Sequence, residues 1–391
     1  MRPCFWICFG IVAYVYAGYP FLLCLGVFSR RRFPPQHSRE NIHERFMGGN
    51  VTVPYVTVIV AAHNEEAAIE TKIESLLASD YPGDRLEILI GSDGSSDRTE
   101  ETVRRYEGDG VGLISFPMQL GKSAMQNSLV AKASGEVLIF TDADCICDPN
   151  ALRFIAENFV DPEVGLVTAA PRYTNESENA VTKNESVYLR YESWIREQES
   201  ARGVLAMASG SLFALRRRLW KPIDRSLGDD FVLPLRVAQA GMRNILERRA
   251  NTTTRLSQKN TGSMFGLKSR IISKDFSALL TYRSILNPFL YPATGISLLS
   301  HKLLRWLVPY FMLGMLLSSA FSNGPLYRVV FWLQFAFYVI ALLGFVFRDR
   351  SFIFPLSVPT SFCVVNLAAL VGIWISLTGR SSGQWTPVRE L

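Results

Sequence analysis

The sequence predicts an α/β domain with a mostly parallel sheet, joined to α-helical transmembrane segments. From residue 55 onward, runs rich in β-branched residues alternate with segments of helical periodicity, which is typical of βαβ units. Outside the middle of the chain, four stretches of about 19 residues or more contain no charged residue, so each is long enough to cross a bilayer as a helix. With 48% hydrophobic and 12% aromatic residues over 391 positions and a mean hydropathy of +0.14, the chain is too apolar overall for an ordinary soluble protein.

The four apolar stretches predict the membrane topology. They cover residues 4–28, 306–327, 329–347 and 351–379. The first is too long for a signal peptide and no cleavage site follows it, so we expect a retained anchor. Arginines at positions 30–32 place residues 29–305 in the cytoplasm by the positive-inside rule, and Arg348 and Arg350 favour the same orientation. We therefore expect a multi-pass cell-membrane protein with a cytoplasmic domain and an outside C-terminus.

Charge and cysteine content narrow the class of partner. The net charge of +6 suits nucleic acid, but much of the basic excess lies beside the apolar stretches, so we expect membrane lipids and no nucleic acid as partners. Only Cys145 and Cys147 fall in the middle domain, so a disulfide framework is not expected.

The strands of the domain are read in chain order. Strands are expected at residues 55–61, 86–90, 111–116 and 137–140, with helices from residue 69, at 98–106 and at 122–133. Right-handed crossovers would cover both faces of a parallel sheet, and ligands of such sheets bind where the strands end. Polar residues follow three of these strands, at Glu65, at Asp93 and at Asp142 with Asp144. We expect these side chains to converge on one cleft.

Asp142 and Asp144 point to a metal. They stand two residues apart just after a strand, so one turn can present both carboxylates to a hard cation such as Mg²⁺ or Mn²⁺ that also binds a diphosphate. Lys122, at a helix start after Gly121, can bring a cation near phosphate, although such a lysine is more often a solvated first-turn residue.

Asp93 and Gly94 point to a nucleoside. The carboxylate can accept hydrogen bonds from a ribose or a base, and the glycine permits close approach of a ligand. The alternative is a turn that caps the next helix. The nucleoside site and the capping turn can both be present if Asp97 or Ser96 caps the helix and Asp93 is left for the ligand.

Four motifs together resemble a known family. They are Ala-Ala-His-Asn-Glu at 61–65, Ser-Asp-Gly-Ser-Ser-Asp-Arg-Thr at 92–99, Gly121-Lys122 with Asn127, and Thr-Asp-Ala-Asp at 141–144. Their order and spacing are similar to those of the inverting family 2 glycosyltransferases of the bacterial polysaccharide synthase type, over residues 53–260. The resemblance implies a GT-A fold. It also implies an acidic pair before a helix, matched by Asp229 and Asp230, and an acceptor-side loop, matched by residues 207–211.

The resemblance assigns roles to individual residues. Asp93 would contact the base, Asp142 and Asp144 the donor and its metal, and Asp230 would be the general base beside Asp229. The implied donor-binding positions are Ala62, Glu65, Asp93, Lys122, Asp142 and Asp144, and the acceptor-side positions are Gly210 and Ser211. Adjacent like charges can raise one pKa of the acidic pair toward a value useful for a base. The alternative is a helix N-terminus that simply favours negative charge.

The chain departs from the processive members in one motif. These members resemble each other in Q-x-x-R-W before the membrane segments, whereas here Gln258 is followed by Lys-Asn-Thr-Gly and the only Arg-Trp pair is Arg305-Trp306. Processive synthesis is therefore in doubt. Residues 264–302 predict amphipathic interface helices, with Ile272 and Phe276 opposite Lys268 and Lys274; an ordinary helix packed on the domain is the alternative.

The expected function is that of a membrane-bound, metal-dependent inverting glycosyltransferase in cell-envelope or exopolysaccharide biosynthesis. A nucleotide-sugar, most plausibly a UDP-sugar, would donate a hexose to a lipid-linked or glycan acceptor. Two alternatives stay open: a processive polysaccharide synthase that also translocates its polymer, and a non-catalytic nucleotide-sugar-binding scaffold.

Overall fold

The computed structural model describes residues 1–27, 53–175, 178, 180–256, 260–347 and 354–379. The chain divides into two compact units. The first comprises residues 1–28, 175–198 and 256–381, and the second comprises residues 29–174, 199–255 and 382–391. The arginines expected to orient the chain, at positions 30–32, 348 and 350, lie outside the described residues, as does Gln258.

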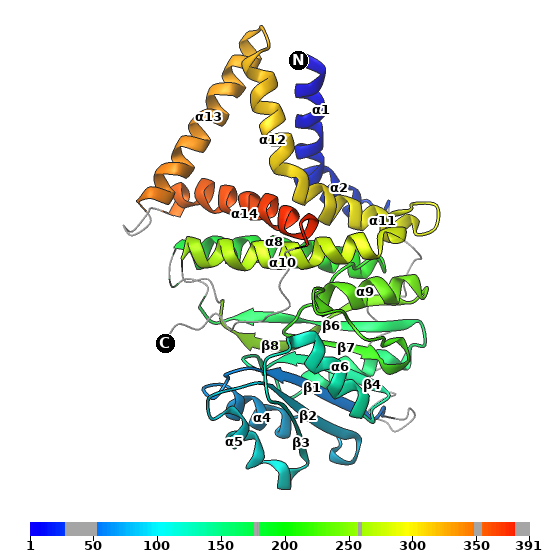
Figure 1. Ribbon diagram of the computed structural model, residues 1–391. Coiled ribbons are helices and arrows are strands. Elements are labelled where there is room, and N and C mark those ends of the chain that lie inside the picture. Colours follow the sequence, from blue (N-terminus) through cyan, green and yellow to red (C-terminus); the bar gives the residue numbers. More distant parts are fainter. Residues whose placement is uncertain (28–52, 176–177, 179, 257–259, 348–353, 380–391) are drawn as a thin grey trace. The chain divides into compact units, whose positions relative to one another are not determined.

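The second unit is built on an eight-stranded sheet with the order β3-β2-β1-β4-β7-β6-β8-β5 (Figure 1). The strands are β1 (Val56–Ala62), β2 (Leu86–Asp93), β3 (Val111–Phe116), β4 (Val137–Asp142), β5 (Ile146–Cys147), β6 (Val164–Tyr173), β7 (Leu212–Arg216) and β8 (Arg243–Thr254). β1 to β4 pair in parallel, as do β6 and β8, whereas β7 runs antiparallel to β4 and β6. The predicted α/β class is confirmed, with a mixed, mostly parallel sheet.

The central strand β1 fixes where the site lies. All of its residues are buried, because a parallel strand in the middle of a doubly covered sheet meets apolar side chains on both faces. Its register pairs Ala61 with Asp142 on β4 and Ala62 with Ser92 on β2. The polar residues that follow β1, β2 and β4 therefore emerge at one edge of the sheet.

Helices connect these strands. They are α4 (Ile69–Leu77), α5 (Thr99–Arg104), α6 (Lys122–Lys132), α7 (Ala151–Glu157) and α9 (Asp229–Gln239). In α4 the residues at i, i+4 and i+7, namely Ile69, Ile73 and Leu76, are fully buried, as expected for an amphipathic helix on a sheet.

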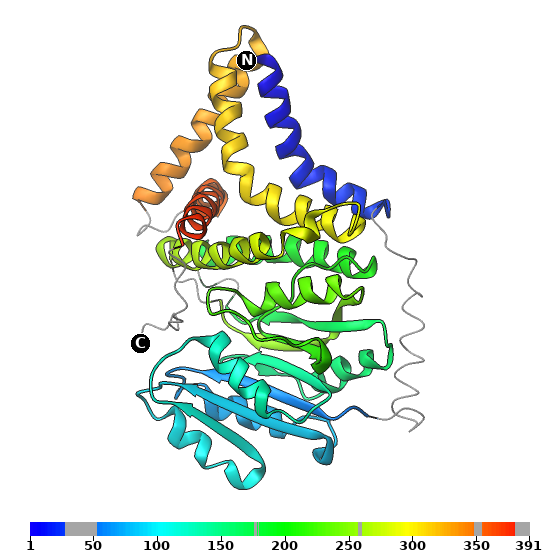
Figure 2. The ribbon, with the colours of Figure 1, turned by 45° about the vertical axis from the view of Figure 1, so that its right-hand side comes forward.

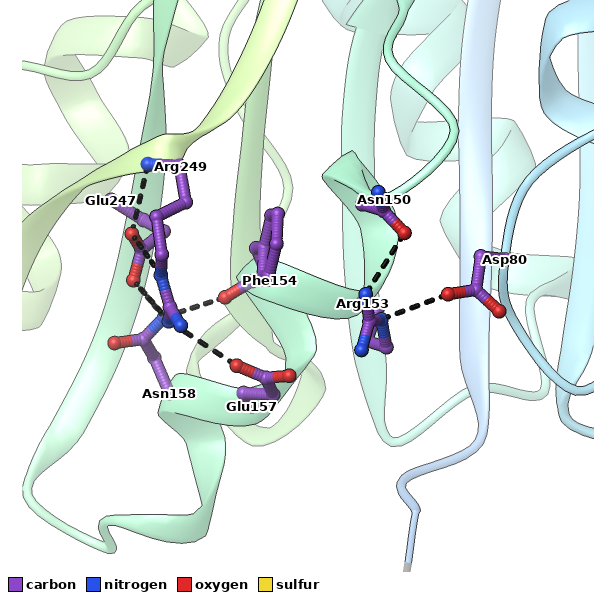
Figure 3. A network of polar contacts seen from close by, with 8 residues as sticks. All are labelled: Asp80, Asn150, Arg153, Phe154, Glu157, Asn158, Glu247 and Arg249. Atoms are coloured by element: carbon purple, nitrogen blue, oxygen red, sulfur yellow. Dashed lines mark hydrogen bonds and ion pairs between the residues drawn. The ribbon is translucent and has the colours of Figure 1, made fainter. Parts of the chain in front are cut away.

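A polar network fixes an irregular part of β8. The pairing of β6 with β8 jumps from Ala169 opposite Glu247 to Ala170 opposite Asn251, so the residues between form a bulge. Arg249 in this bulge donates from Nε to Glu247 Oε1 at 3.0 Å and from Nη2 to Glu157 Oε2 of α7 at 3.2 Å (Figure 3). The bulge is thereby held on α7, and beyond it β8 pairs with β5.

The first unit is helical. It contains α1 (Arg2–Ala13), a π-helical turn at Tyr14–Gly18, α2 (Tyr19–Cys24), α10 (Thr261–Thr281), α11 (Pro292–Ser297), a π-helical turn at Leu298–Leu303, α12 (Leu304–Ala320), α13 (Pro325–Val346) and α14 (Phe354–Leu377). Four helical segments are long and apolar enough to cross a membrane: Arg2–Cys24, Pro292–Ala320, Pro325–Val346 and Ser357–Leu377. The second of these begins well before the predicted residue 306, because the helix continues through His301 and Lys302.

A buried charge network lets that helix contain His301 and Lys302. Glu192 accepts hydrogen bonds from His301 Nε2 at 3.1 Å, from Lys302 Nζ at 3.2 Å and from Arg305 Nη1 at 2.8 Å. Burial acts to raise the pKa of Glu192, but the three cationic side chains outweigh it and hold the pKa well below its ordinary value. Arg305 also lies over the rings of Tyr188 and Tyr191.

Glu192 belongs to α8 (Ala180–Ala201), a helix inside the region predicted as part of the sheet domain. The structure groups residues 175–198 with the first unit instead. Polar contacts explain the difference: besides the Glu192 network, Glu185 forms an ion pair with Lys268 of α10 at 2.6 Å. The sheet domain is thus discontinuous in sequence.

Candidate active site

The loops after β1 and β2 hold each other at the edge of the sheet. Asn64, with φ of 54°, receives on its Oδ1 a hydrogen bond from Ser96 N at 2.8 Å. Glu65 N donates to Thr99 Oγ1 at 2.8 Å, and the Glu65 side chain is buried. Ala62, at the end of β1, is fully buried as well. These two predicted donor-binding residues are therefore buried at this edge of the sheet.

Asp93 has a different environment from the one expected. Its carboxylate is fully buried and accepts hydrogen bonds from the backbone N–H groups of Leu120 at 2.7 Å and Gly121 at 2.8 Å. These hydrogen bonds fix the turn before α6, where Gly121 adopts φ of 101°. Asp97, two residues before α5 begins, accepts on its Oδ1 a hydrogen bond from Thr99 N at 3.0 Å, and Arg98 is the N-cap residue of the helix. The role of Asp93 toward a base stays a prediction.

Asp142 and Asp144 stand at the end of β4, as predicted. Their carboxylate oxygens and the Cys145 thiol lie within 4.8 Å of one another, with Asp144 exposed and Cys145 buried. Burial and then the charges of Asp142 and Asp144 raise the pKa of the Cys145 thiol, and sulfur is not a ligand that hard cations such as Mg²⁺ prefer. The oxygen donors that remain fit a hard divalent cation such as Mg²⁺ or Mn²⁺.

Lys122 connects this turn to the acidic pair. Its Nζ lies 2.8 Å from Asp142 Oδ1 and 3.6 Å from Asp229 Oδ2. Asp229 also accepts a hydrogen bond from Gln126 Nε2 at 2.7 Å, one turn further along α6. Because one ammonium group reaches both carboxylates, the aspartates after β4 and at the start of α9 belong to the same cluster.

The same helix fixes the segment that leads into α9. Asn127 and Ile223 exchange two hydrogen bonds of 2.9 Å, and Ser123 Oγ donates to Leu227 O at 3.2 Å. With Lys122 and Gln126, four positions on one side of α6 hold residues 223–229. The acidic pair is therefore placed by α6.

The two carboxyl groups of the pair differ in pKa. Burial and then the adjacent Asp229 carboxylate raise the pKa of Asp230 to about 6. Burial also acts to raise the pKa of Asp229, but the Lys122 charge and the Gln126 hydrogen bond outweigh it and lower that pKa. One group is thus held ionised while its neighbour is poised to take up a proton, which is the division expected around a general base.

The predicted acceptor-side loop passes between these elements. A Cβ placed on Gly210 would lie 3.4 Å from Asp142 Oδ2, an ordinary van der Waals distance, so Gly210 lies next to that carboxylate. Ser211 O accepts from Thr141 Oγ1 at 2.6 Å, and Ala208 N donates to Asp230 O at 2.8 Å. The loop therefore contacts both the aspartates after β4 and the acidic pair.

Sequence reasoning missed one cation behind the site. Lys72 of α4 is fully buried, and its Nζ donates to Thr141 Oγ1 and to Cys145 O, each at 2.7 Å. Lys72 thus stabilises the turn that contains Asp142 and Asp144. Its position beside Ile69 and Ile73 in the apolar stripe of α4 was the available signal, because a lysine at a core position needs a buried partner.

Comparison with known proteins bears on the family and the fold of the chain. Residues 57–223 match the family model described as Glycosyl transferase family 2. Similar proteins include a Beta-monoglucosyldiacylglycerol synthase of Synechocystis sp., 29% identical over 202 residues, which are 49% of this chain and 42% of that protein. A Poly-beta-1,6-N-acetyl-D-glucosamine synthase of Staphylococcus aureus is 35% identical over 124 residues, 31% of this chain and 30% of that protein. The chain thus matches less than half the length of these curated relatives.

Among solved structures, a mannosyltransferase, PcManGT from Pyrobaculum calidifontis in complex with GDP-Man and Mn²⁺, has a TM-score of 0.67. The similarity covers 96% of this chain and 99% of that one at 19% sequence identity, so it bears on the fold alone. The predicted GT-A fold with appended membrane helices is confirmed.

Proposed function

We propose, from the premise that this chain carries a glycosyl transferase family 2 domain, that it transfers a sugar from a nucleotide-sugar to an acceptor at the membrane with inversion at the anomeric carbon. One observation carries the proposal. Lys122 forms ion pairs with both Asp142 and Asp229, so the donor-side aspartates and the acidic pair meet at one place. A transferase needs this proximity, because the leaving group and the base act on opposite faces of one carbon.

The donor side would be formed by Asp142, Asp144 and Lys122. Asp142 and Asp144 are the oxygen donors that fit a divalent cation, and such a cation, when bound, stabilises the negative charge on the departing diphosphate. Lys122 supplies a fixed positive charge beside them, suited to phosphate oxygens. The similar archaeal structure contains GDP-Man and Mn²⁺, which supports a nucleotide-sugar and Mn²⁺ as first choices, beside the UDP-sugar and Mg²⁺ expected from the sequence.

The acceptor side would be formed by Asp230 and the loop at 207–211. Asp230 accepts the proton of the acceptor hydroxyl as that oxygen bonds to the anomeric carbon and the bond from this carbon to the diphosphate breaks. A pKa of about 6 leaves Asp230 largely ionised at neutral pH and still basic enough to take the proton. Asp229 stays ionised beside Lys122 and acts on Asp230 through its charge.

The acceptor is proposed to be lipid-linked or a membrane-associated glycan. Four helices long and apolar enough to cross a membrane support a membrane location, and a relative named as a Beta-monoglucosyldiacylglycerol synthase supports a lipid acceptor. The lack of a Q-x-x-R-W motif favours single addition over the processive synthesis named for the staphylococcal relative.

The test is nucleotide release by the full chain, purified in detergent with native lipid. A panel of UDP- and GDP-sugars is offered with Mn²⁺, with Mg²⁺ or with a chelator, to the unchanged protein and to Asp142→Asn. Asp84→Asn is the matched control, because Asp84 is exposed and takes no part in the cluster. We expect metal-dependent release of one nucleotide that Asp142→Asn loses and Asp84→Asn keeps.

The product separates the alternatives. One added sugar per acceptor, seen by mass spectrometry of the lipid extract, supports the proposal. A ladder of long products would favour a processive synthase. Donor binding without release under every lipid condition would favour a non-catalytic scaffold and overturn the proposal.

A further inference from the structure

Helix α14 is as apolar as a membrane span, yet polar contacts tie its two ends to α8 and α10. Near its start, Asn184 Nδ2 of α8 donates to Ser357 Oγ and to Ser361 Oγ, each at 2.8 Å. Near its end, Ser376 Oγ lies 2.7 Å from Ser277 Oγ of α10. A helix that leaves this layer to cross a bilayer cannot keep contacts at both ends.

Between those ends, α14 packs closely on α10. A Cβ placed on Gly372 would lie 2.8 Å from Ser269 O and 3.0 Å from Ile272 Cβ, so glycine is what allows the two backbones to approach. Figure 1 shows α14 lying next to α10. The two helices therefore pack against each other in one layer.

Helix α10 does not suit the interior of a bilayer. It carries Lys268, Arg270, Lys274 and Asp275, and of the described helices it is not among those long and apolar enough to span. Charged side chains at the centre of a bilayer are costly and are rare in spanning helices. Because α14 packs on α10, α14 could cross the bilayer only if α10 and its charged side chains entered the hydrocarbon with it.

The other apolar helices differ, because they pair with one another. Arg2 Nη2 of α1 donates to Asn323 O, in the turn after α12, at 3.0 Å, and a Cβ on Gly314 of α12 would lie 2.9 Å from Cys8 Sγ. α1 and α12 thus pack on each other, and α13 follows α12 directly in the chain; α13 also meets α14, where Thr360 Oγ1 donates to Ala341 O at 3.2 Å. A turn joins α12 and α13 at one end of each helix. In both views α14 lies across the opposite ends of these two helices (Figures 1 and 2).

The surface of α14 needs an apolar partner. Val358, Leu367, Trp374 and Leu377 are 45%, 53%, 52% and 64% exposed. Exposed aliphatic side chains favour an apolar surrounding, and an indole such as that of Trp374 is favoured at the boundary between headgroups and acyl chains.

We propose that α14 lies in the plane of the membrane, with its exposed side chains in the lipid leaflet on the side of the family 2 domain. The described chain then crosses the bilayer three times, at Arg2–Cys24, Pro292–Ala320 and Pro325–Val346. Gly379, just after α14, then lies on the same side of the membrane as the family 2 domain. This differs from the outside C-terminus that hydropathy predicts. Length and composition alone could not reveal this, because a lying and a crossing helix of this kind have the same composition.

The first test measures the side on which α14 ends. Thr378→Cys, Asn323→Cys and Asp84→Cys, all at exposed positions, are introduced one at a time into the full chain. Each is treated with a membrane-impermeant maleimide in sealed vesicles of either orientation, and labelling at the new cysteine is read by mass spectrometry. Asp84→Cys reports the side of the family 2 domain and Asn323→Cys the opposite side.

We expect Thr378→Cys to be labelled from the same side as Asp84→Cys. Labelling from the side of Asn323→Cys, or from neither side, would overturn the proposal. Fluorescence of the labelled protein in gel filtration identifies a variant that fails to fold, and a reporter fused after Leu391 then answers the same question without a substitution in α14.

The second test measures depth. Nitroxides at Val358 and Leu377 are compared with nitroxides at Val329 and Val346 of α13, using oxygen and a water-soluble nickel complex as relaxing agents. Val358 and Leu377 are 19 positions apart, so a crossing helix would separate their depths by roughly 28 Å. We expect equal depths for the α14 pair and opposite membrane faces for the α13 pair; opposite faces for both pairs would overturn the proposal.

Discussion

The two units of the molecule hold charge clusters of opposite composition. In the second unit one cation, Lys122, lies between the carboxylates of Asp142 and Asp229, with further acidic groups beside them. In the first unit one carboxylate, Glu192, receives hydrogen bonds from a histidine, a lysine and an arginine. Both clusters join segments far apart in sequence. Of the two, only the Lys122 cluster has more negative charge than its own cation can balance.

In the proposed function, that difference separates a reactive cluster from a structural one. Around Lys122, burial and the surplus of carboxylates raise the pKa of Asp230, and the carboxylates provide oxygen donors for a divalent cation. Around Glu192, three donors hold the one carboxylate ionised, so it has no proton to exchange near neutral pH. The comparison predicts that changes in the Lys122 cluster affect the reaction and that changes in the Glu192 cluster affect the stability of the fold.

The largest effect is expected from Asp230→Asn. An amide of the same size cannot take up the acceptor proton, so kcat should fall by about 10²–10⁴. Sugar transfer from radiolabelled donor is the measurement, with the thermal midpoint recorded in parallel and expected to stay unchanged. Asp109→Asn, at an exposed position, is the matched control. Activity within tenfold of the unchanged protein would remove Asp230 from the role of base.

Glu192→Gln should produce the opposite pattern. It leaves Lys302 and Arg305 buried without their carboxylate, and breaking a buried pair in this way costs about 3–5 kcal/mol of folding free energy. The thermal midpoint in detergent should fall clearly, while nucleotide-sugar affinity at low temperature is kept. Adding Lys302→Met to this variant should recover part of the loss. An unchanged midpoint would show that the network contributes no stability.

Lys122→Met should have an intermediate effect on chemistry. Removing the ammonium leaves Asp142 and Asp229 to repel each other and removes a positive charge from the donor side, so we expect kcat/KM to fall about 10- to 100-fold, or roughly 1.4–2.8 kcal/mol. Lys132→Met, at the exposed end of the same helix, is the control. Equal losses in both variants would mean that α6 tolerates no methionine and that the ion pairs are not the cause.

The smallest effect is a dependence on pH. A base works only when deprotonated, so a pKa of about 6 means that the ionised fraction of Asp230 rises from about a tenth at pH 5 to about nine tenths at pH 7. The transfer rate at saturating substrate should therefore rise about tenfold over this interval and stay level above it. A rate that is flat from pH 5 to 8 would contradict the raised pKa.

Local patterns in the sequence predicted the parallel half of the sheet well. The expected strand at 111–116 is β3, Val111–Phe116, and the helix expected at 122–133 is α6, Lys122–Lys132. β-branched runs and apolar residues at helical spacing are local signals of this kind. The antiparallel insertion of β7 and the membership of α8 in the other unit depend on contacts between distant residues, which a local pattern does not contain.

The site was predictable where a motif exists and not elsewhere. Asp142, Asp229 and Asp230 follow from short motifs and are found in one cluster with Lys122. Lys72 and Glu192 belong to no motif, and a single charged residue in a helix ordinarily lies in solvent. Their partners come from segments distant in sequence, so only the folded chain reveals why they are buried.

Helix α6 has a practical consequence for the exchange of parts between related transferases. Its first turns bond to residues 223–229 through Ser123 and Asn127 and reach the acidic pair through Lys122 and Gln126. A chimera that imports either segment alone would set foreign side chains against native backbone carbonyls. Swapping the two together, as one unit of helix and loop, would keep the contacts that place Asp229 and Asp230.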